Sequence, residues 1–488
     1  MTNLDTAVFT AYDGVPANNP TGGYTVTLGA AQSVAGIVIG SATAPGNDGQ
    51  LTLTGTGSPG LTLGAGGLTL NGSTGDPTLS ANLGTVTLAA DQTWTVNNAH
   101  VWTINSAIAG NATVGNTRTF TLGYVNAFTN VYSGIISNGA GGGELALTVN
   151  NTNGLTTGGG TQSITGNAST YTGKTSVLRG LLQITSLKDL GVASSLGAPT
   201  TVANGTIDLG SAANAASLYF QGSAASSSNR VINLAGTFLG ATLKNNSAAA
   251  TSTLTLSGGI TNGGGGSKIL TLGGTNAGAN LISGVISDAL DFSTTGVTKT
   301  ESGFWTLGGA NTYTGGTVIN AGTLAISPTG TLGQDIVGNN ITISGGNLLL
   351  NAATNVGSNQ AIIVSAAGGG IGVSYDPVSF PTVTDNSGTT GGVFGLNYTG
   401  TGGIGSVAGV DALFTSSSFW SLGSFSGGSG TYTGTSLTPG SGSTYRIGGG
   451  GGTINFTNNI LVGANNVIFG STGGGIVNTT NANTYTGT

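Results

Sequence analysis

The chain has 488 residues, of which only nine are Lys or Arg, fifteen are Asp or Glu, and 93 are Gly. One His, no Cys and a formal net charge of −6 leave few groups for metal, thiol or triad chemistry, and too few cations to neutralise nucleic-acid phosphates. No apolar run is long enough for a membrane-spanning helix, and residues 1–5 lack the basic and apolar regions of a signal peptide.

Apolar residues alternate with Thr in many short stretches along the chain. In chain order, the clearest stretches are residues 24–28, 51–54, 61–63, 68–70, 85–88, 253–256 and 341–343. This period of two places Leu, Val and Ile on one face of a strand and Thr on the other. Clusters of Gly, Asn and Ser separate the stretches and favour turns. The pattern predicts an all-β chain, either an array of β-sandwiches or a β-solenoid of stacked turns.

Internal repeats favour the solenoid. Residues 169–191 align without a gap on residues 311–333, which pairs Gly191 with Gly333. Upstream of them, residues 120–137 align on residues 270–287 in the same order. Fragments of the same motif recur at residues 431–435 and 483–488. A module of about 70 residues therefore occurs twice, as expected for a solenoid.

The second copy resembles a known family. The sequence TLGGANTYTGGT at residues 306–317, followed by AGTL at residues 321–324, is similar to the passenger-associated transport repeat, also called the autotransporter-associated β-strand repeat. The preceding SGVIS at residues 283–287 resembles the segment before that repeat. The resemblance implies a right-handed parallel β-helix displayed outside a bacterial cell.

We therefore expect a right-handed parallel β-helix that forms a single elongated rod, with longer loops around residues 365–450, where Pro and Ser-rich stretches occur. We expect five segments in chain order: N-terminal coils at 1–119, a first repeat module at 120–191, connecting coils at 192–269, a second module at 270–333 and C-terminal coils at 334–488.

The repeat residues are expected to be structural. Tyr171 and Tyr313 would occupy equivalent positions over a turn or a coil edge. The repeat glycines are Gly173, Gly180, Gly315 and Gly322, and we expect Gly180 and Gly322 to permit a tight corner.

Neither end of the chain shows a capping repeat, and residues 483–488 stop within the repeat motif. We expect the strand edges at the two ends to join one copy to the next, which would build a head-to-tail filament. The alternative is that residue 488 is a processing boundary inside a longer stalk. The residues expected in that contact are Val8, Phe9, Tyr12, Tyr485 and Thr486.

No catalytic site, metal site or cofactor is expected, and the protein is predicted not to be an enzyme. Asp288 and Asp291 are the closest acidic pair, with Glu301 farther along, and we interpret them as turn residues rather than an acid–base or calcium site. His100 has no carboxylate nearby in sequence. The four Trp residues could stack on sugars or plug coil ends or loops.

The sequence thus predicts a structural protein of the bacterial cell surface, a fibre subunit or adhesin stalk whose main partner is another copy of itself. The alternative is a β-helix protein that binds or cleaves surface glycans. Acidic and aromatic residues gathered on one face would favour the alternative. No nucleic-acid partner and no membrane span are expected.

Overall fold

The computed structural model describes residues 5–9, 23–40, 50–71, 76–97, 101–124, 128–151, 160–365, 369–377, 382–386, 391–397, 420–425, 428–440, 442–470 and 474–487. The chain divides into two compact units, residues 1–268 and 269–488. Each unit is described by itself.

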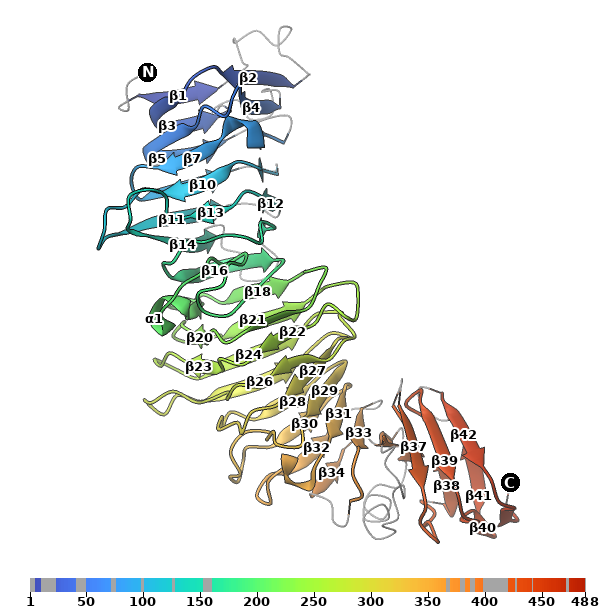
Figure 1. The fold of residues 1–488 in the computed structure, drawn as a ribbon. Coiled ribbons are helices and arrows are strands. Elements are labelled where there is room, and N and C mark those ends of the chain that lie inside the picture. Colours follow the sequence, from blue (N-terminus) through green and yellow to red (C-terminus); the bar gives the residue numbers. More distant parts are fainter. Residues whose placement is uncertain are drawn as a thin grey trace. The chain divides into compact units, whose positions relative to one another are not determined.

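The first unit is built from short strands (Figure 1). They are β1 (Thr6–Phe9), β2 (Tyr24–Leu28), β3 (Gln32–Ile39), β4 (Leu51–Gly55), β5 (Leu61–Leu70), β6 (Thr78–Leu79), β7 (Thr85–Leu88), β8 (Gln92–Val96), β9 (Thr103–Ile104), β10 (Ala107–Gly110), β11 (Thr117–Tyr124), β12 (Thr129–Tyr132), β13 (Ile136–Ser137), β14 (Glu144–Asn151), β15 (Thr161–Ile164), β16 (Thr175–Ile184), β17 (Ile207–Leu209), β18 (Ala216–Phe220), β19 (Ser226–Ser228), β20 (Ile232–Leu234), β21 (Ala241–Asn245), β22 (Leu254–Leu256) and β23 (Ile260–Asn262). Its helices are single turns, η2 (Ala81–Leu83) and α1 (Val202–Gly205).

The second unit has the same construction. Its strands are β24 (Lys268–Gly273, which begins at the unit boundary), β25 (Asn280–Ile282), β26 (Thr295–Lys299), β27 (Phe304–Leu307), β28 (Thr317–Ile319), β29 (Thr323–Ile326), β30 (Ile341–Ile343), β31 (Asn347–Leu350), β32 (Ile362–Val364), β33 (Gly370–Val373), β34 (Val383–Asp385), β35 (Val393–Leu396), β36 (Ser421–Gly423), β37 (Ser429–Tyr432), β38 (Thr444–Ile447), β39 (Thr453–Phe456), β40 (Val462–Gly463), β41 (Asn466–Phe469), β42 (Ile476–Thr479) and β43 (Thr484–Tyr485). One 3-10 turn, η3 (Ala353–Asn355), lies between β31 and β32.

Each strand pairs in parallel with the equivalent strand of the neighbouring turn. In the first unit, β8, β11, β14, β16, β17, β20 and β23 form one such ladder. In the second unit, β26, β28, β30, β32 and β34 form another. Long ladders of this kind define a solenoid, whereas sandwiches of antiparallel strands would pair sequence neighbours. The prediction of an all-β parallel solenoid is confirmed.

The core follows from the register of the ladders. Leu122 pairs with Trp94 on one side and with Val149 on the other, and all three side chains are buried. Their neighbours along each strand, such as Thr121 and Thr148, lie on the outer face and are partly exposed. Inward rows of aliphatic side chains therefore supply the apolar burial, while Thr satisfies the outer face without charge.

The region expected to hold longer loops, residues 365–450, lies partly outside the described residues. The described parts contain strands that continue the parallel ladder of the second unit, from β33 to β35, β36 and β38. Along this ladder Ile371, Phe394 and Leu422 stand in register and are all buried. The solenoid core therefore extends through these segments.

Candidate functional site

The two copies of the repeat enclose equivalent tyrosines. Tyr171 and Tyr313 are both fully buried. The Tyr171 hydroxyl lies 2.8 Å from Thr175 Oγ1, and the Tyr313 hydroxyl lies 2.7 Å from Thr317 Oγ1. Burial raises the pKa of Tyr171 to about 12 and raises that of Tyr313 further, because a phenolate would lose its hydration. The neutral tyrosines therefore act as packing groups with one satisfied hydroxyl each.

The repeat glycines lie where successive turns meet. Gly173 N donates to Leu145 O, and Gly315 N donates to Thr295 O, each at 2.9 Å. A Cβ atom would approach those same oxygens to 2.5 and 2.6 Å, respectively, so a larger residue does not fit. Gly180 and Gly322 have positive φ angles of 96° and 67°, which side chains disfavour.

The end of the repeat differs from the sequence alignment. Ala198 N donates to Tyr171 O at 2.9 Å, and Gln334 N donates to Tyr313 O at 3.0 Å. The residues before these donors, Gly197 and Gly333, both have positive φ and both lie against the tyrosine carbonyl. Gly197 is therefore the structural counterpart of Gly333. The ungapped alignment pairs Gly191 with Gly333, because it allows for no insertion and the first copy has additional residues before Gly197.

The strongest acidic candidate, Asp288, holds two turns together. Its Oδ1 accepts hydrogen bonds from Thr295 N at 2.7 Å and from Thr314 N at 3.2 Å. Its Oδ2 accepts one from Thr314 Oγ1 at 2.6 Å. These hydrogen bonds come from two backbone N–H groups and one hydroxyl, all within the second unit.

Asn138 makes the same set of contacts in the first copy. Its Oδ1 accepts from Leu145 N at 2.9 Å and from Thr172 N at 3.0 Å, while its Nδ2 donates to Thr172 Oγ1 at 2.8 Å. The threonine hydroxyl donates to the carboxylate of Asp288 but accepts from the amide of Asn138, so a neutral amide replaces the carboxylate without loss of a contact. The carboxylate of Asp288 therefore has a structural counterpart that carries no charge. Extending the upstream alignment by one residue would have paired these two positions.

The other two acidic candidates also bind backbone. Asp291 Oδ1 accepts from Ser293 N at 3.1 Å, and Glu301 Oε2 accepts from Gly274 N at 2.6 Å. Among the residues that the structure describes, no cluster of three or more His, Asp or Glu side chains could hold a metal ion. His100 lies outside the described residues.

Sequence reasoning missed the buried cations. Lys299 is fully buried, and its Nζ donates to the carbonyl oxygens of Thr300 at 2.6 Å, Glu301 at 2.8 Å and Ala321 at 3.2 Å. Loss of hydration lowers the Lys299 pKa from 10.5 to about 8, opposed by the nearby negative charge of Glu301. In the sequence, the signal for a buried lysine was its position at the end of a strand in a chain with only nine Lys or Arg.

Arg230 serves the same purpose in the first unit. Its Nε donates to Gly205 O and its Nη1 to Leu196 O, both at 2.7 Å. Burial lowers the pKa of this guanidinium, and the neighbouring Tyr171 opposes the shift. Both cations therefore satisfy backbone carbonyls at places where no strand ladder reaches them.

The tryptophans are not sugar-binding platforms, because each is at most 1% exposed. Trp94 packs edge-on against Phe120, with ring centroids 4.8 Å apart. Trp305 Nε1 donates to Gly273 O at 2.8 Å, and Trp420 Nε1 donates to Asp385 Oδ2 at 2.8 Å. The rings fill the interior of each solenoid unit.

The described residues expected in a filament contact lie in or directly beside strands β1 and β43. Val8 in β1 is 61% exposed, and Phe9 is partly buried. Tyr485 in β43 is 37% exposed, and Thr486 beside it is exposed. Tyr12 lies outside the described residues. The two described groups belong to different units of one chain.

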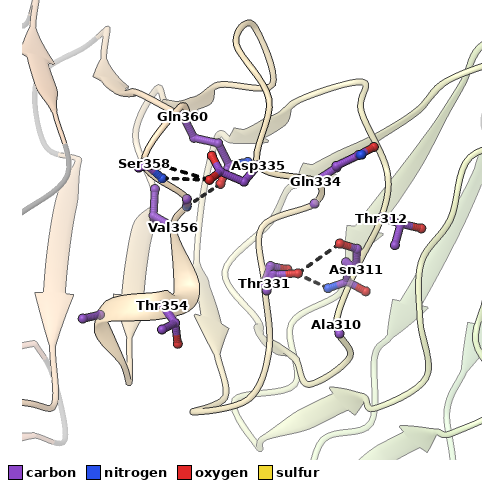
Figure 2. A pocket seen from close by; sticks show the side chains of 13 residues that line it. Ala310, Asn311, Thr312, Thr331, Gln334, Asp335, Thr354, Val356, Ser358 and Gln360 are labelled. Carbon is purple, nitrogen blue, oxygen red and sulfur yellow. Dashed lines mark hydrogen bonds between the residues drawn. The ribbon is translucent and has the colours of Figure 1, made fainter.

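A groove of about 640 Å³ lies on the second unit (Figure 2). One side is closed by Asn311 and Thr331: Asn311 Nδ2 donates to Thr331 O at 2.7 Å, and Thr331 Oγ1 donates to Asn311 O at 3.0 Å. On the other side Asp335 accepts from Ser358 N at 3.2 Å and from Asn359 N at 2.7 Å. Asp335 is the one ionisable residue of the described lining.

Comparison with known proteins identifies the repeats. The family described as passenger-associated-transport-repeat matches residues 155–184 and 297–326, which contain Tyr171 and Tyr313. The chain therefore contains two passenger-associated transport repeats. A stretch of 95 residues, 20% of this chain, is 42% identical to the Adhesin BmaC autotransporter of Brucella suis biovar 1 (strain 1330) and spans 3% of that protein. No solved structure matches the chain.

Replacing Asp288 tests whether its charge has a function. Asp288→Asn should change the free energy of unfolding by less than about 0.5 kcal/mol, because an amide makes the same contacts at Asn138. Asp288→Ala should cost about 1–3 kcal/mol, because two backbone N–H groups lose their acceptor. Denaturant unfolding followed by tryptophan fluorescence measures both. Equal destabilisation by the two variants would show that the charge itself is required.

Lys299 should make stability depend on pH. Its folded-state pKa of about 8 is below the ordinary 10.5, so between these values the unfolded chain binds more protons. Stability should therefore rise as pH increases from about 8 toward 10.5, and the cost of burying the charge should be fully present below pH 8. Thermal unfolding of the native chain and of Lys299→Met from pH 7 to 10 measures this. A difference in Tm that stays constant across this range would contradict it.

Proposed function

We propose that this chain is part of a bacterial cell-surface protein in which the solenoid serves as a structural stalk. Two passenger-associated transport repeats and the similarity to a stretch of an autotransporter adhesin support this proposal. Because the similar stretch spans 3% of that adhesin, the adhesive role of a whole protein is also part of the proposal.

The observation that carries the proposal is a side-chain clamp present in both repeats, in which one side chain accepts hydrogen bonds from backbone N–H groups of two turns. Asn138 and Asp288 hold the same backbone groups in the two copies, once with an amide and once with a carboxylate. A catalytic carboxylate would need its charge or its proton, whereas a clamp needs only an oxygen acceptor. The conservation of contacts without conservation of charge supports a structural, non-enzymatic role.

An extracellular location fits the composition of the chain. The low charge and the Thr-rich outer face suit a protein whose copies lie close together on a surface. Within the described part of the chain, no helix is both long and apolar enough to cross a bilayer. The proposed location outside the cell rests on the two repeats and on the similarity to an autotransporter adhesin.

Head-to-tail assembly is the finer part of the proposal. Exposed apolar side chains on strands β1 and β43 support it, among them Val8 and Tyr485. Backbone groups on a strand edge can pair with a strand of another copy. The four Trp give no support to the alternative of a glycan-binding protein, since all four are buried.

Protease treatment of intact cells tests the surface location. We expect trypsin to remove the protein from unbroken cells of the source organism, because a displayed stalk is accessible from outside. Immunoblotting with a cytoplasmic marker as control measures the effect. Protection of the protein until the cells are lysed would contradict the proposed location.

Electron microscopy of the purified chain tests the filament. We expect fibres in the native protein and shorter or no fibres in Val8→Ser and Tyr485→Ser, because each change removes exposed apolar area from a proposed contact. Val114→Ser, at a valine that is 79% exposed elsewhere, is the matched control. Single particles at high concentration would refute assembly and leave the stalk proposal standing.

A further inference from the structure

Two loops of the second unit expose large apolar side chains. In the loop between β25 and β26, Leu290 is 103% exposed and Phe292 is 93% exposed. In the loop between β29 and β30, Val337 is 85% exposed and Ile336 is 38% exposed. Gathered apolar side chains on a polar protein mark interaction surfaces more often than isolated ones do.

Hydrogen bonds anchor both loops to the same short segment. Asp288, in the first loop, accepts from Thr314 N and Thr314 Oγ1. Asn339, in the second loop, accepts from Gly316 N at 2.9 Å and donates to Tyr313 O at 3.0 Å. The bases of the two loops therefore flank residues 313–316, and their exposed residues belong to one corner of the solenoid.

The backbone of Phe292 is strained as well as exposed. Its φ angle is 66°, a conformation that suits Gly or Asn and that bulky residues rarely adopt. Neither solvation nor local conformation favours a phenylalanine there. Leu239 in the first unit combines a φ angle of 79° with 50% exposure, beside the half-exposed Phe238. Strained residues of this kind cluster at functional sites, so Phe292 marks a candidate interaction site.

The charge around the loops indicates the chemistry of the partner. Residues 287–294 and 334–340 contain Asp288, Asp291 and Asp335 and no Lys, Arg or His. The groove of Figure 2 adjoins the second loop through Gln334 and Asp335. An acidic corner disfavours a second acidic copy of this chain and an anionic membrane, and it favours a cationic partner.

We propose that this corner binds a protein segment in which apolar side chains alternate with Lys or Arg. The apolar side chains of the segment pack on Leu290, Phe292 and Val337, and a cationic side chain enters the groove beside Asp335. This binding role goes beyond the stalk function and does not depend on it.

Binding of defined peptides to the full chain tests the proposal. The probes are a fluorescent amphipathic peptide of Leu and Lys and the same peptide with Glu in place of Lys, measured by fluorescence anisotropy. We expect the Lys peptide alone to bind. The double variant Leu290→Ser/Phe292→Asn should weaken binding at least about tenfold, and Asp335→Asn about threefold. The control Val114→Ser should bind as the native chain does.

Thermal unfolding separates binding from folding. Phe292→Asn should raise Tm, because Asn tolerates the positive φ and removes an exposed ring. A lower Tm would show that Phe292 is structural and would overturn the proposal. Equal binding of the two peptides, or binding unchanged by the double variant, would also overturn it. So would association with phosphatidylcholine vesicles or with a second copy that the double variant abolishes, since either result identifies a different occupant.

Discussion

Parallel hydrogen bonding between successive turns is the constraint on which the rest of this structure depends. Neighbouring strands lie about 4.8 Å apart, so residues in register, such as Trp94, Leu122 and Val149, must share one face. Like charges in register at that spacing would repel each other. This explains why Thr, rather than Lys or Glu, covers the outer faces of the strands. The same spacing leaves no room for a side chain where turns touch at their corners, as at Gly173.

The corners between strands create a second requirement, since backbone N–H and C=O groups there lie outside the strand ladders and need other hydrogen-bond partners. Buried amides fill this need. Asn355 accepts from Asn351 N and Ala352 N and donates to Ser327 O and Gly330 O. Gln360 donates to Leu332 O and Asn339 O. Lys299 and Arg230 do the same with a charge, at a larger cost of desolvation. The polar composition of the chain thus serves its own backbone, which leaves few groups for chemistry on a substrate.

On such a solenoid, apolar side chains lie inside and small polar side chains lie outside. We expect binding function where this pattern is interrupted. The outer faces follow the pattern, with Thr, Ser and Asn in register from turn to turn. The loops that carry Leu290, Phe292 and Val337 interrupt this pattern, because they expose large apolar side chains to solvent. In the functions proposed above, the stacked strands form the stalk and these loops form its binding surface.

The sequence by itself determined the local structure and the repeat. Alternation of Leu and Thr identified the strands, and the paired motifs around Tyr171 and Tyr313 identified equivalent turns, because both signals lie within a few residues. Contacts between turns could not be predicted in this way. Their spacing varies from 19 residues between Phe304 and Thr323 to 36 between Gly180 and Ala216. Only the tertiary structure decided that Gly197 corresponds to Gly333, that the alignable residues Asn138 and Asp288 bind the same backbone groups, and that all four Trp face inward. Each of these depends on which distant residue a turn of variable length brings into contact.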